Sequence, residues 1–132
     1  MNKKDIRWKQ RFENYKKALA LLEDGMKVKD PSLLERAGLI QVFEMSFELA
    51  WKTLKDYLED KGHLLTAPRD VLKQAFQNGV IEKGETWLKA LSDRNLTTHL
   101  YNEAKASELL SAIQKDHLPL LIALKKHLEN EF

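Results

Sequence analysis

Residues 30–62 read DPSLLERAGLIQVFEMSFELAWKTLKDYLEDKG, and this stretch decides the fold. Apolar residues recur along it at helical spacing, and no helix breaker interrupts it before Gly62 apart from Gly38. A single internal glycine costs a helix about 1 kcal/mol and does not end it. We therefore predict one helix of roughly thirty residues. Its predicted apolar face comprises Leu33, Ala37, Ile40, Phe43, Phe47, Ala50, Leu54 and Leu58.

The start of this helix has two candidate caps, and its length suggests a partner. Asp30 can cap with Pro31 at the first helical position, or Ser32 can pair with Glu35 in a capping box. A helix this long has little to pack against in a small globule. We therefore expect the chain to dimerise along it, through apolar residues that include Trp51, Leu54 and Leu58.

The flanking segments are also predicted to be helical. An apolar seam at steps of three and four residues predicts a first helix over about residues 5–24, stopped by Gly25 in the left-handed conformation. Two short helices follow, over about 68–78 and 83–91. A long one begins between Thr97 and Asn102 and is kinked or divided at Pro119. The prediction is an all-α up-and-down bundle of three long and two short helices, in a single domain over residues 1–132.

Composition excludes several classes of protein. The chain has no cysteine, which rules out disulfides, thiolate metal sites and a cysteine nucleophile. No apolar run approaches the roughly twenty residues of a bilayer span, and no signal-like region follows the N-terminus. We therefore expect a cytoplasmic protein with no membrane association.

The charge is nearly balanced overall but uneven along the chain. The net charge is +2, from 22 basic and 20 acidic residues, so no global field for nucleic acid exists. Residues 1–17 nevertheless hold seven basic residues against two acidic ones. This cluster indicates either the solvated face of a first helix or an electrostatic guide for RNA or an acidic partner.

Familiar catalytic and metal-binding patterns do not occur in the sequence. It contains neither a glycine-rich phosphate loop nor a His-Glu-x-x-His pair. We expect no metal site and no cofactor. Three histidines, His63, His117 and His127, are expected at the surface or at helix ends. The acidic pairs Glu44/Glu48 and Asp56/Asp60 are expected on a solvated helix face. Glu48 and Lys52 are expected to form an i,i+4 ion pair on the same kind of face.

One polar segment, residues 92–101 (SDRNLTTHLY), lies between two predicted helices. Arg94 offers a fork for phosphate, His99 can transfer protons near neutral pH, and Tyr101 offers a hydroxyl. Asn95, Thr97 and Thr98 can donate hydrogen bonds or cap a helix. Cleavage of an RNA phosphodiester needs a base, a group that stabilises negative charge on the phosphate, and an acid. His99 suits the first role and Arg94 the second, without a metal ion.

Helix geometry limits this interpretation. In a continuous helix Arg94 and His99 would stand roughly 140° apart, too far to share one phosphate easily. Either the segment bends, or two copies of the motif meet across a symmetric dimer. Alternatively, Arg94 binds carbonyls or a carboxylate, the threonines cap a helix and His99 is structural.

The run Arg94-x4-His99-x-Tyr101 resembles the R-x4-H-x-Y signature of HEPN-domain proteins of the HepT type. The similarity extends from about residue 8 to 128 and includes the pattern of the small nucleotidyltransferase substrate-binding proteins. The residues that carry this pattern are 47–52, Leu54, 57–58, Gly62, 68–70, 75–76, 79–81, Trp87 and 94–97.

The resemblance implies a four-helix-bundle-like HEPN fold, a homodimer whose motifs face each other, and a minimal nucleotidyltransferase as partner. It also implies two candidate activities. In one, Arg94 and His99 cleave RNA in a toxin-antitoxin module until the partner transfers AMP to Tyr101, the AMPylation acceptor, so that a nucleotide binds beside the motif. In the other, the protein is a non-catalytic subunit that presents substrate to the nucleotidyltransferase. A purely structural helical dimer, with the polar segment as a cap, is a third hypothesis.

Overall fold

The computed structural model describes residues 2–95 and 102–131, and all the regular structure in these ranges is helical. The all-α prediction is confirmed. The last three elements follow one another without a break, so the expected three long and two short helices are present. In chain order the elements are α1 (Lys3–Gly25), α2 (Leu33–Asp60), α3 (Pro68–Gln77), α4 (Gly84–Asn95), α5 (Glu103–Ala112), a π-helical turn (Ile113–His117) and α6 (Leu118–Glu129).

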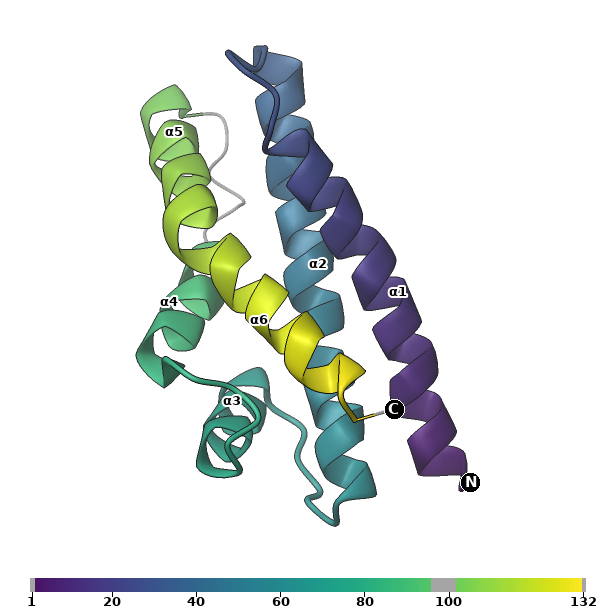
Figure 1. Cartoon of the computed structure of the whole chain (residues 1–132). Helices are drawn as coiled ribbons and strands as arrows, with labels where there is room; N and C mark the ends of the chain where they lie inside the picture. The colour runs from purple at the N-terminus through teal and green to yellow at the C-terminus, as the bar shows by residue number, and fades with distance from the viewer. Residues whose placement is uncertain (1, 96–101, 132) are drawn as a thin grey trace.

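The long helices α1 and α2 form the frame of the molecule. They run antiparallel and lie side by side, and the bent run from α5 through α6 crosses them (Figure 1). The short helices α3 and α4 pack beside α2 and against each other. None of the helices within the described ranges is long and apolar enough to cross a bilayer.

Helix α1 buries the apolar seam that its sequence predicted, namely Trp8, Phe12, Tyr15, Leu19 and Leu22. The ring of Trp8 meets Tyr57 of α2 edge-on, with 5.1 Å between the ring centroids. We call Trp8, Phe12, Tyr15 and Tyr57 the aromatic seam.

Gly25 has a different role from the one predicted. It is the last residue of α1 and does not adopt a positive φ, so it is not a left-handed stop. A Cβ atom at this position would overlap the side chain of Leu39 in α2. The glycine therefore allows the end of α1 to approach α2 closely.

Helix α2 begins with the capping box. The Ser32 hydroxyl accepts from the Glu35 N–H at 3.1 Å, and the Glu35 carboxylate accepts from the Ser32 N–H at 2.8 Å. The alternative cap, Asp30, instead has a φ of 48° in the preceding turn. The first two turns of the predicted apolar face, at Leu33 and Ala37, are exposed, and the buried face of α2 begins at Ile40.

The C-terminal helical run is interrupted where Pro119 was expected to disturb it. Pro119 lacks the N–H that would bond to the Lys115 carbonyl in a regular α-helix. The chain forms a π-turn just before the proline, in which the Leu118 N–H bonds to the Ile113 carbonyl five residues back. This turn bends the run between α5 and α6 and places His117 inside the molecule.

Candidate functional site

Arg94 and Asn95 are the last two residues of α4. The polar segment was expected to lie wholly between helices, but Ser92 to Asn95 continue α4 as its last turn. The helix persists because its other side packs into the core through Trp87, Ala90 and Leu91. The arginine of the motif therefore stands on a regular helix, and its backbone position is set by packing.

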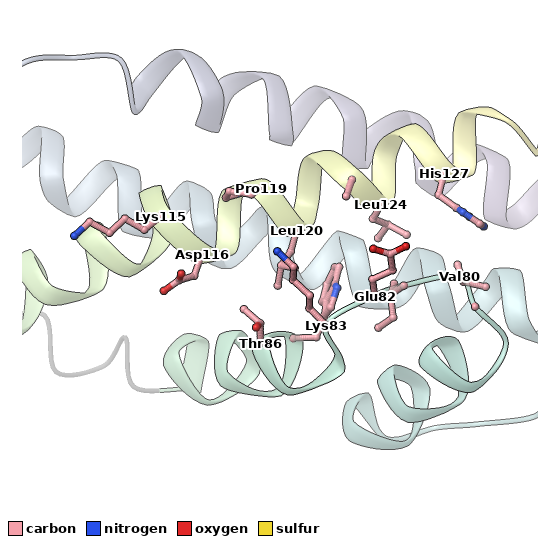
Figure 2. Close-up of a pocket in the computed structure, with 14 residues that line it drawn as sticks. Val80, Glu82, Lys83, Thr86, Lys115, Asp116, Pro119, Leu120, Leu124 and His127 are labelled. Atoms are coloured by element: carbon pink, nitrogen blue, oxygen red, sulfur yellow. The ribbon is translucent and has the colours of Figure 1, made fainter.

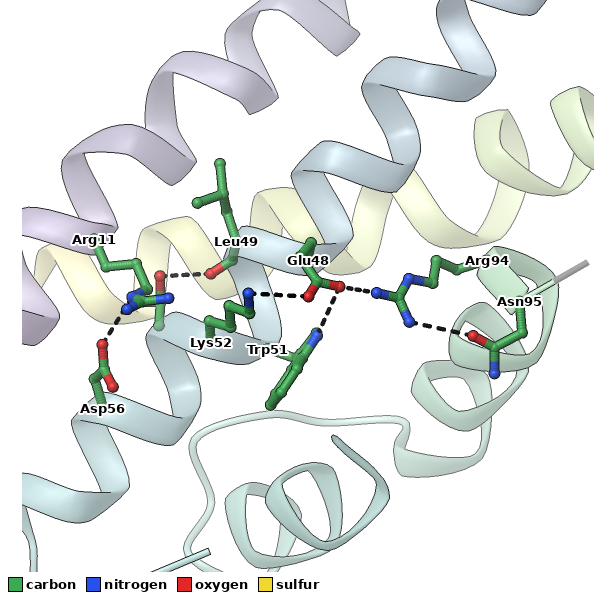
Figure 3. Close-up of polar contacts among 9 residues, drawn as sticks. Arg11, Glu48, Leu49, Trp51, Lys52, Asp56, Arg94 and Asn95 are labelled. Carbon is green, nitrogen blue, oxygen red and sulfur yellow. Dashed lines mark hydrogen bonds and ion pairs between the residues drawn. The ribbon is translucent and has the colours of Figure 1, made fainter. Parts of the chain in front are cut away.

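The Arg94 guanidinium is anchored to the middle of α2. Its Nη2 atom forms an ion pair with Oε2 of Glu48, and Nη1 donates to Oδ1 of Asn95 at 3.2 Å (Figure 3). The Arg94 side chain is 27% exposed and that of Glu48 is 30% exposed, so solvent screens this pair only in part. A partly exposed guanidinium is a group that can bind an anion such as a phosphate.

The Glu48 carboxylate has several hydrogen-bonding and ion-pair partners besides Arg94. Oε2 also accepts from the Trp51 indole Nε1 at 3.1 Å, and Oε1 pairs with Lys52 Nζ at 3.2 Å. The sequence predicted the Lys52 pair but placed Glu48 on a solvated face. Its partner Arg94 is 46 residues away, beyond the reach of local spacing. The alternative in which Arg94 binds a carboxylate is thus realised in this structure.

The remaining motif residues lie outside the described part of the chain. Thr97, Thr98, His99 and Tyr101 fall within residues 96–101, so their predicted roles stay predictions. The chain is next described at Asn102, whose side chain caps α5 by accepting from the Lys105 N–H at 3.2 Å. The segment that holds His99 and Tyr101 is thus joined to two defined helix ends.

His117 lies at a helix end, one of the two predicted placements, where the π-turn meets α6. His117 is buried, at 1% exposure, and its Nε2 lies 2.7 Å from Oδ2 of Asp93 in α4. His63 contacts Asn78 at 3.2 Å, and His127 lies on the last turn of α6 near Glu131. We call Glu48, Asp93, Arg94 and His117 the polar junction, because these groups gather where α2, α4 and the π-turn meet.

Several of the basic residues near the N-terminus are paired. Arg11 Nε lies 2.8 Å from Oδ2 of Asp56, and Arg7 Nη1 lies 3.4 Å from Oε2 of Glu59. Asp56 is itself buried, which corrects its placement on a solvated face. These pairs bind α1 to α2 and favour a helix-face role for this cluster. Among the described residues no three histidines or carboxylates gather in a way that could hold a metal ion.

A separate cavity of about 310 Å³ lies between the α3–α4 connection and α6 (Figure 2). Buried apolar residues such as Trp87 and Leu124 form part of its wall, and charged side chains of both signs surround it, among them Glu82, Lys83 and Asp116. These residues lie outside the Arg94 motif.

Comparisons with known proteins point to one family. The family model described as nucleotidyltransferase substrate binding protein like matches residues 10–130. A curated Haemophilus influenzae protein named "Probable ribonuclease HepT" is 31% identical over an alignment of 83 residues that covers 58% of this chain and 56% of that protein. The chain therefore spans just over half the length of this curated relative.

Solved structures share the fold. A crystal structure of a Thermus thermophilus protein superposes with a TM-score of 0.75 at 33% identity, over 89% of this chain and 97% of the other. A Haemophilus influenzae structure, described as revealing the fold of a substrate binding domain of a nucleotidyltransferase, gives a TM-score of 0.67 at 24% identity. It covers 92% of this chain and 96% of its own, and at that identity it shows the fold alone.

Proposed function

This chain belongs to the nucleotidyltransferase substrate binding protein like family, and we propose that it is the ribonuclease partner of a minimal nucleotidyltransferase. In this proposal it cuts RNA until the partner transfers AMP to Tyr101. The observation that carries the proposal is the half-buried Arg94 at the end of α4, held by Glu48 directly before the segment that contains His99 and Tyr101. The resemblance to a protein named as a ribonuclease supports the same interpretation.

The proposed reaction is an internal phosphoryl transfer within RNA. His99 removes the proton from a ribose 2′-hydroxyl, and the 2′-oxygen forms a bond to phosphorus. The bond from phosphorus to the 5′-oxygen of the next nucleotide breaks, and that oxygen takes up a proton from an acid. Arg94 stabilises the additional negative charge on the phosphate oxygens. The products are a 2′,3′-cyclic phosphate and a 5′-hydroxyl.

The proposed switch uses the same anion-binding group. The Tyr101 oxygen attacks the α-phosphorus of ATP, the phenolic proton leaves, and pyrophosphate is released. The resulting phosphodiester places a bulky anion two residues from His99 in the sequence. It would compete with RNA for the Arg94 guanidinium and fill the site.

We also infer a homodimer, through a different surface from the one expected. Trp51, Leu54 and Leu58 are buried within a single chain and are not available to a second copy. The exposed apolar residues of α2 lie nearer its start, with Leu34 at 83% and Met45 at 44% exposure. Eleven residues apart, they share one face of the helix. Glu48 follows on nearly the same face, so a dimer through this surface would bring two Arg94 sites close together.

RNA cleavage by the purified full chain in EDTA tests the proposed ribonuclease. We expect cleavage to fall at least about 100-fold in Arg94→Ala and in His99→Ala, because each variant removes one of two groups that act in the transition state. Arg69→Ala and His127→Ala are matched controls outside the motif and should cleave like the wild type. Equal cleavage by the wild type and His99→Ala would reject the ribonuclease.

A non-catalytic subunit of a two-component nucleotidyltransferase is the second candidate. The family to which the chain belongs is described by substrate binding, and this description favours the second candidate. This candidate predicts a stable complex with a small nucleotidyltransferase and no cleavage that depends on His99. Co-expression followed by intact-mass measurement separates the two candidates further, since each AMP transferred to Tyr101 adds a discrete mass that Tyr101→Phe should abolish.

A further inference from the structure

The polar junction contains a buried carboxylate and imidazole that the proposed reaction does not use. Asp93 and His117 are 8% and 1% exposed, and Nε2 of His117 donates to Oδ2 of Asp93 at 2.7 Å. Burial of such a pair is costly, and apolar residues of similar size often stabilise a core as well or better. The pair is therefore better explained by the geometry that it imposes than by stability.

The surroundings of His117 restrict its ring. The imidazole stacks on Phe43 of α2, with 5.6 Å between ring centroids and 20° between the planes. Its second nitrogen, Nδ1, has no hydrogen-bond partner among the described residues, so Asp93 is the group there that orients the ring. Asp93 also accepts from Lys89 Nζ, which lies 2.8 Å from Oδ1 and 3.0 Å from Oδ2. One buried carboxylate thus links the last turn of α4 to the π-turn.

Asp93 and Arg94 are neighbours that reach in different directions. Consecutive residues of a helix are about 100° apart around the axis. Asp93 therefore ties α4 to the π-turn, while Arg94 ties it to Glu48 on α2. Two attachments on different sides of α4 fix both the rotation of its last turn about the helix axis and its position along that axis.

From this geometry we propose that Asp93 and His117 are positioning residues for Arg94. They set the direction in which the guanidinium points and the place where α4 ends at Asn95, just before the segment that holds His99 and Tyr101. The consequence for catalysis rests on the proposed ribonuclease. The positioning of Arg94 does not depend on the proposed ribonuclease, so the positioning and its consequence for catalysis are tested in separate experiments.

Three substitutions separate positioning from simple packing. His117→Leu keeps an apolar side chain of similar size but removes the donor to Asp93. His117→Gln keeps an N–H donor near the place of Nε2. Asp93→Asn keeps the shape of the carboxylate but loses its charge. Ser92→Ala and Asp116→Asn change exposed residues adjacent to the pair and serve as matched controls.

The first experiment observes Arg94 directly, by NMR of the arginine Nε–H groups in the full chain. Assignment uses the signal that disappears in Arg94→Lys. We expect His117→Leu and Asp93→Asn to shift or broaden the Arg94 signal, His117→Gln to restore it, and both controls to leave it unchanged. The Arg69 signal on α3 should stay constant throughout. An unchanged Arg94 signal in folded His117→Leu overturns the proposal, and if that variant does not fold, the same result in Asp93→Asn does so.

The second experiment measures RNA cleavage with the same variants. We expect kcat to fall about tenfold in His117→Leu with KM within a factor of about two, because a small displacement of a charge-stabilising group slows the chemical step. His117→Gln should recover most of the rate. A wild-type kcat in folded His117→Leu overturns the link to catalysis. If the wild type itself cleaves no RNA, the proposed function fails, whereas the NMR result still decides the positioning.

Discussion

The aromatic seam and the polar junction each join α2 to a neighbouring helix, and they are built in opposite ways. In the seam, Trp8, Phe12 and Tyr57 bury rings against one another, and the interior is stabilised mainly by apolar area. In the junction, Asp93 and His117 take up interior volume that apolar side chains could fill, and Glu48 holds Arg94 beside them. This difference indicates that the seam stabilises the packing of α1 on α2. The junction instead positions the Arg94 side chain, and it does so at some cost to the free energy of unfolding.

The largest effect is expected in the seam. Phe12→Ala should lower the free energy of unfolding by about 3–5 kcal/mol, because it removes a fully buried ring and leaves a cavity. Urea denaturation measures this. Leu21→Ala on the same helix, where the side chain is 54% exposed, is the control and should cost much less. A cost below about 1 kcal/mol for Phe12→Ala would mean that the seam does not support the fold.

In the junction, substitution should affect function more than stability. Glu48→Gln removes the charge that holds Arg94, and we expect RNA cleavage to fall about tenfold because the guanidinium is no longer fixed. The free energy of unfolding should change by less than about 1 kcal/mol, since the pair is partly exposed. Glu44→Gln, one turn away, is the control. Faster cleavage in Glu48→Gln would show instead that the carboxylate inhibits by occupying Arg94.

Tyr15 supplies a hydrogen bond within the seam. Its hydroxyl donates to the Leu121 carbonyl at 2.5 Å and joins α1 to α6. Burial, with a contribution from the charge of Glu23, raises the pKa of Tyr15 well above its usual range. Tyr15→Phe should therefore cost about 1 kcal/mol at neutral pH.

The same substitution has a pH signature. A raised pKa in the folded state means that the stabilisation is complete below the unfolded pKa of about 10 and is lost progressively above it. Urea denaturation at increasing pH should show a steeper decline for the wild type than for Tyr15→Phe above that value. Parallel declines would contradict the buried neutral phenol.

The smallest effect, and one of opposite sign, is expected at Ser46. Its hydroxyl is buried within α2 and has no hydrogen-bond partner in the part of the chain that the structure describes. Ser46→Ala should raise the free energy of unfolding by about 0.5–1 kcal/mol, because alanine removes an unsatisfied polar group and favours the helix. Thermal denaturation measures the change. A loss of stability would show that the hydroxyl makes a favourable interaction in the folded state.

The sequence predicted what local spacing and capping determine. The seam of α1, the length of α2 and Ser32 with Glu35 as one of two candidate caps all follow from residues within a few positions of one another. The role of Gly25 did not, because it depends on Leu39 of the neighbouring helix.

The polar junction was beyond local patterns for the same reason. Glu48 and Arg94 are 46 residues apart, and Asp93 and His117 are 24 residues apart. Each carboxylate could be interpreted from the sequence as solvated, since nothing nearby marks its partner. Pro119 did indicate a disturbance in the last helix, but not that a π-turn would carry His117 into the interior.

The π-turn has a consequence for the whole C-terminal run. With Leu118 bonded to Ile113, the turn holds one residue more than an α-helical path requires. Deleting Gln114 would restore the ordinary register and rotate α6 by about 100° relative to α5. Because α5 packs on α2 while α6 reaches α1, the buried faces of α5 and α6 could then no longer point toward these neighbours at the same time. The additional residue thus rotates α6 relative to α5, so that one continuous helical run can pack on α2 at one end and reach α1 at the other.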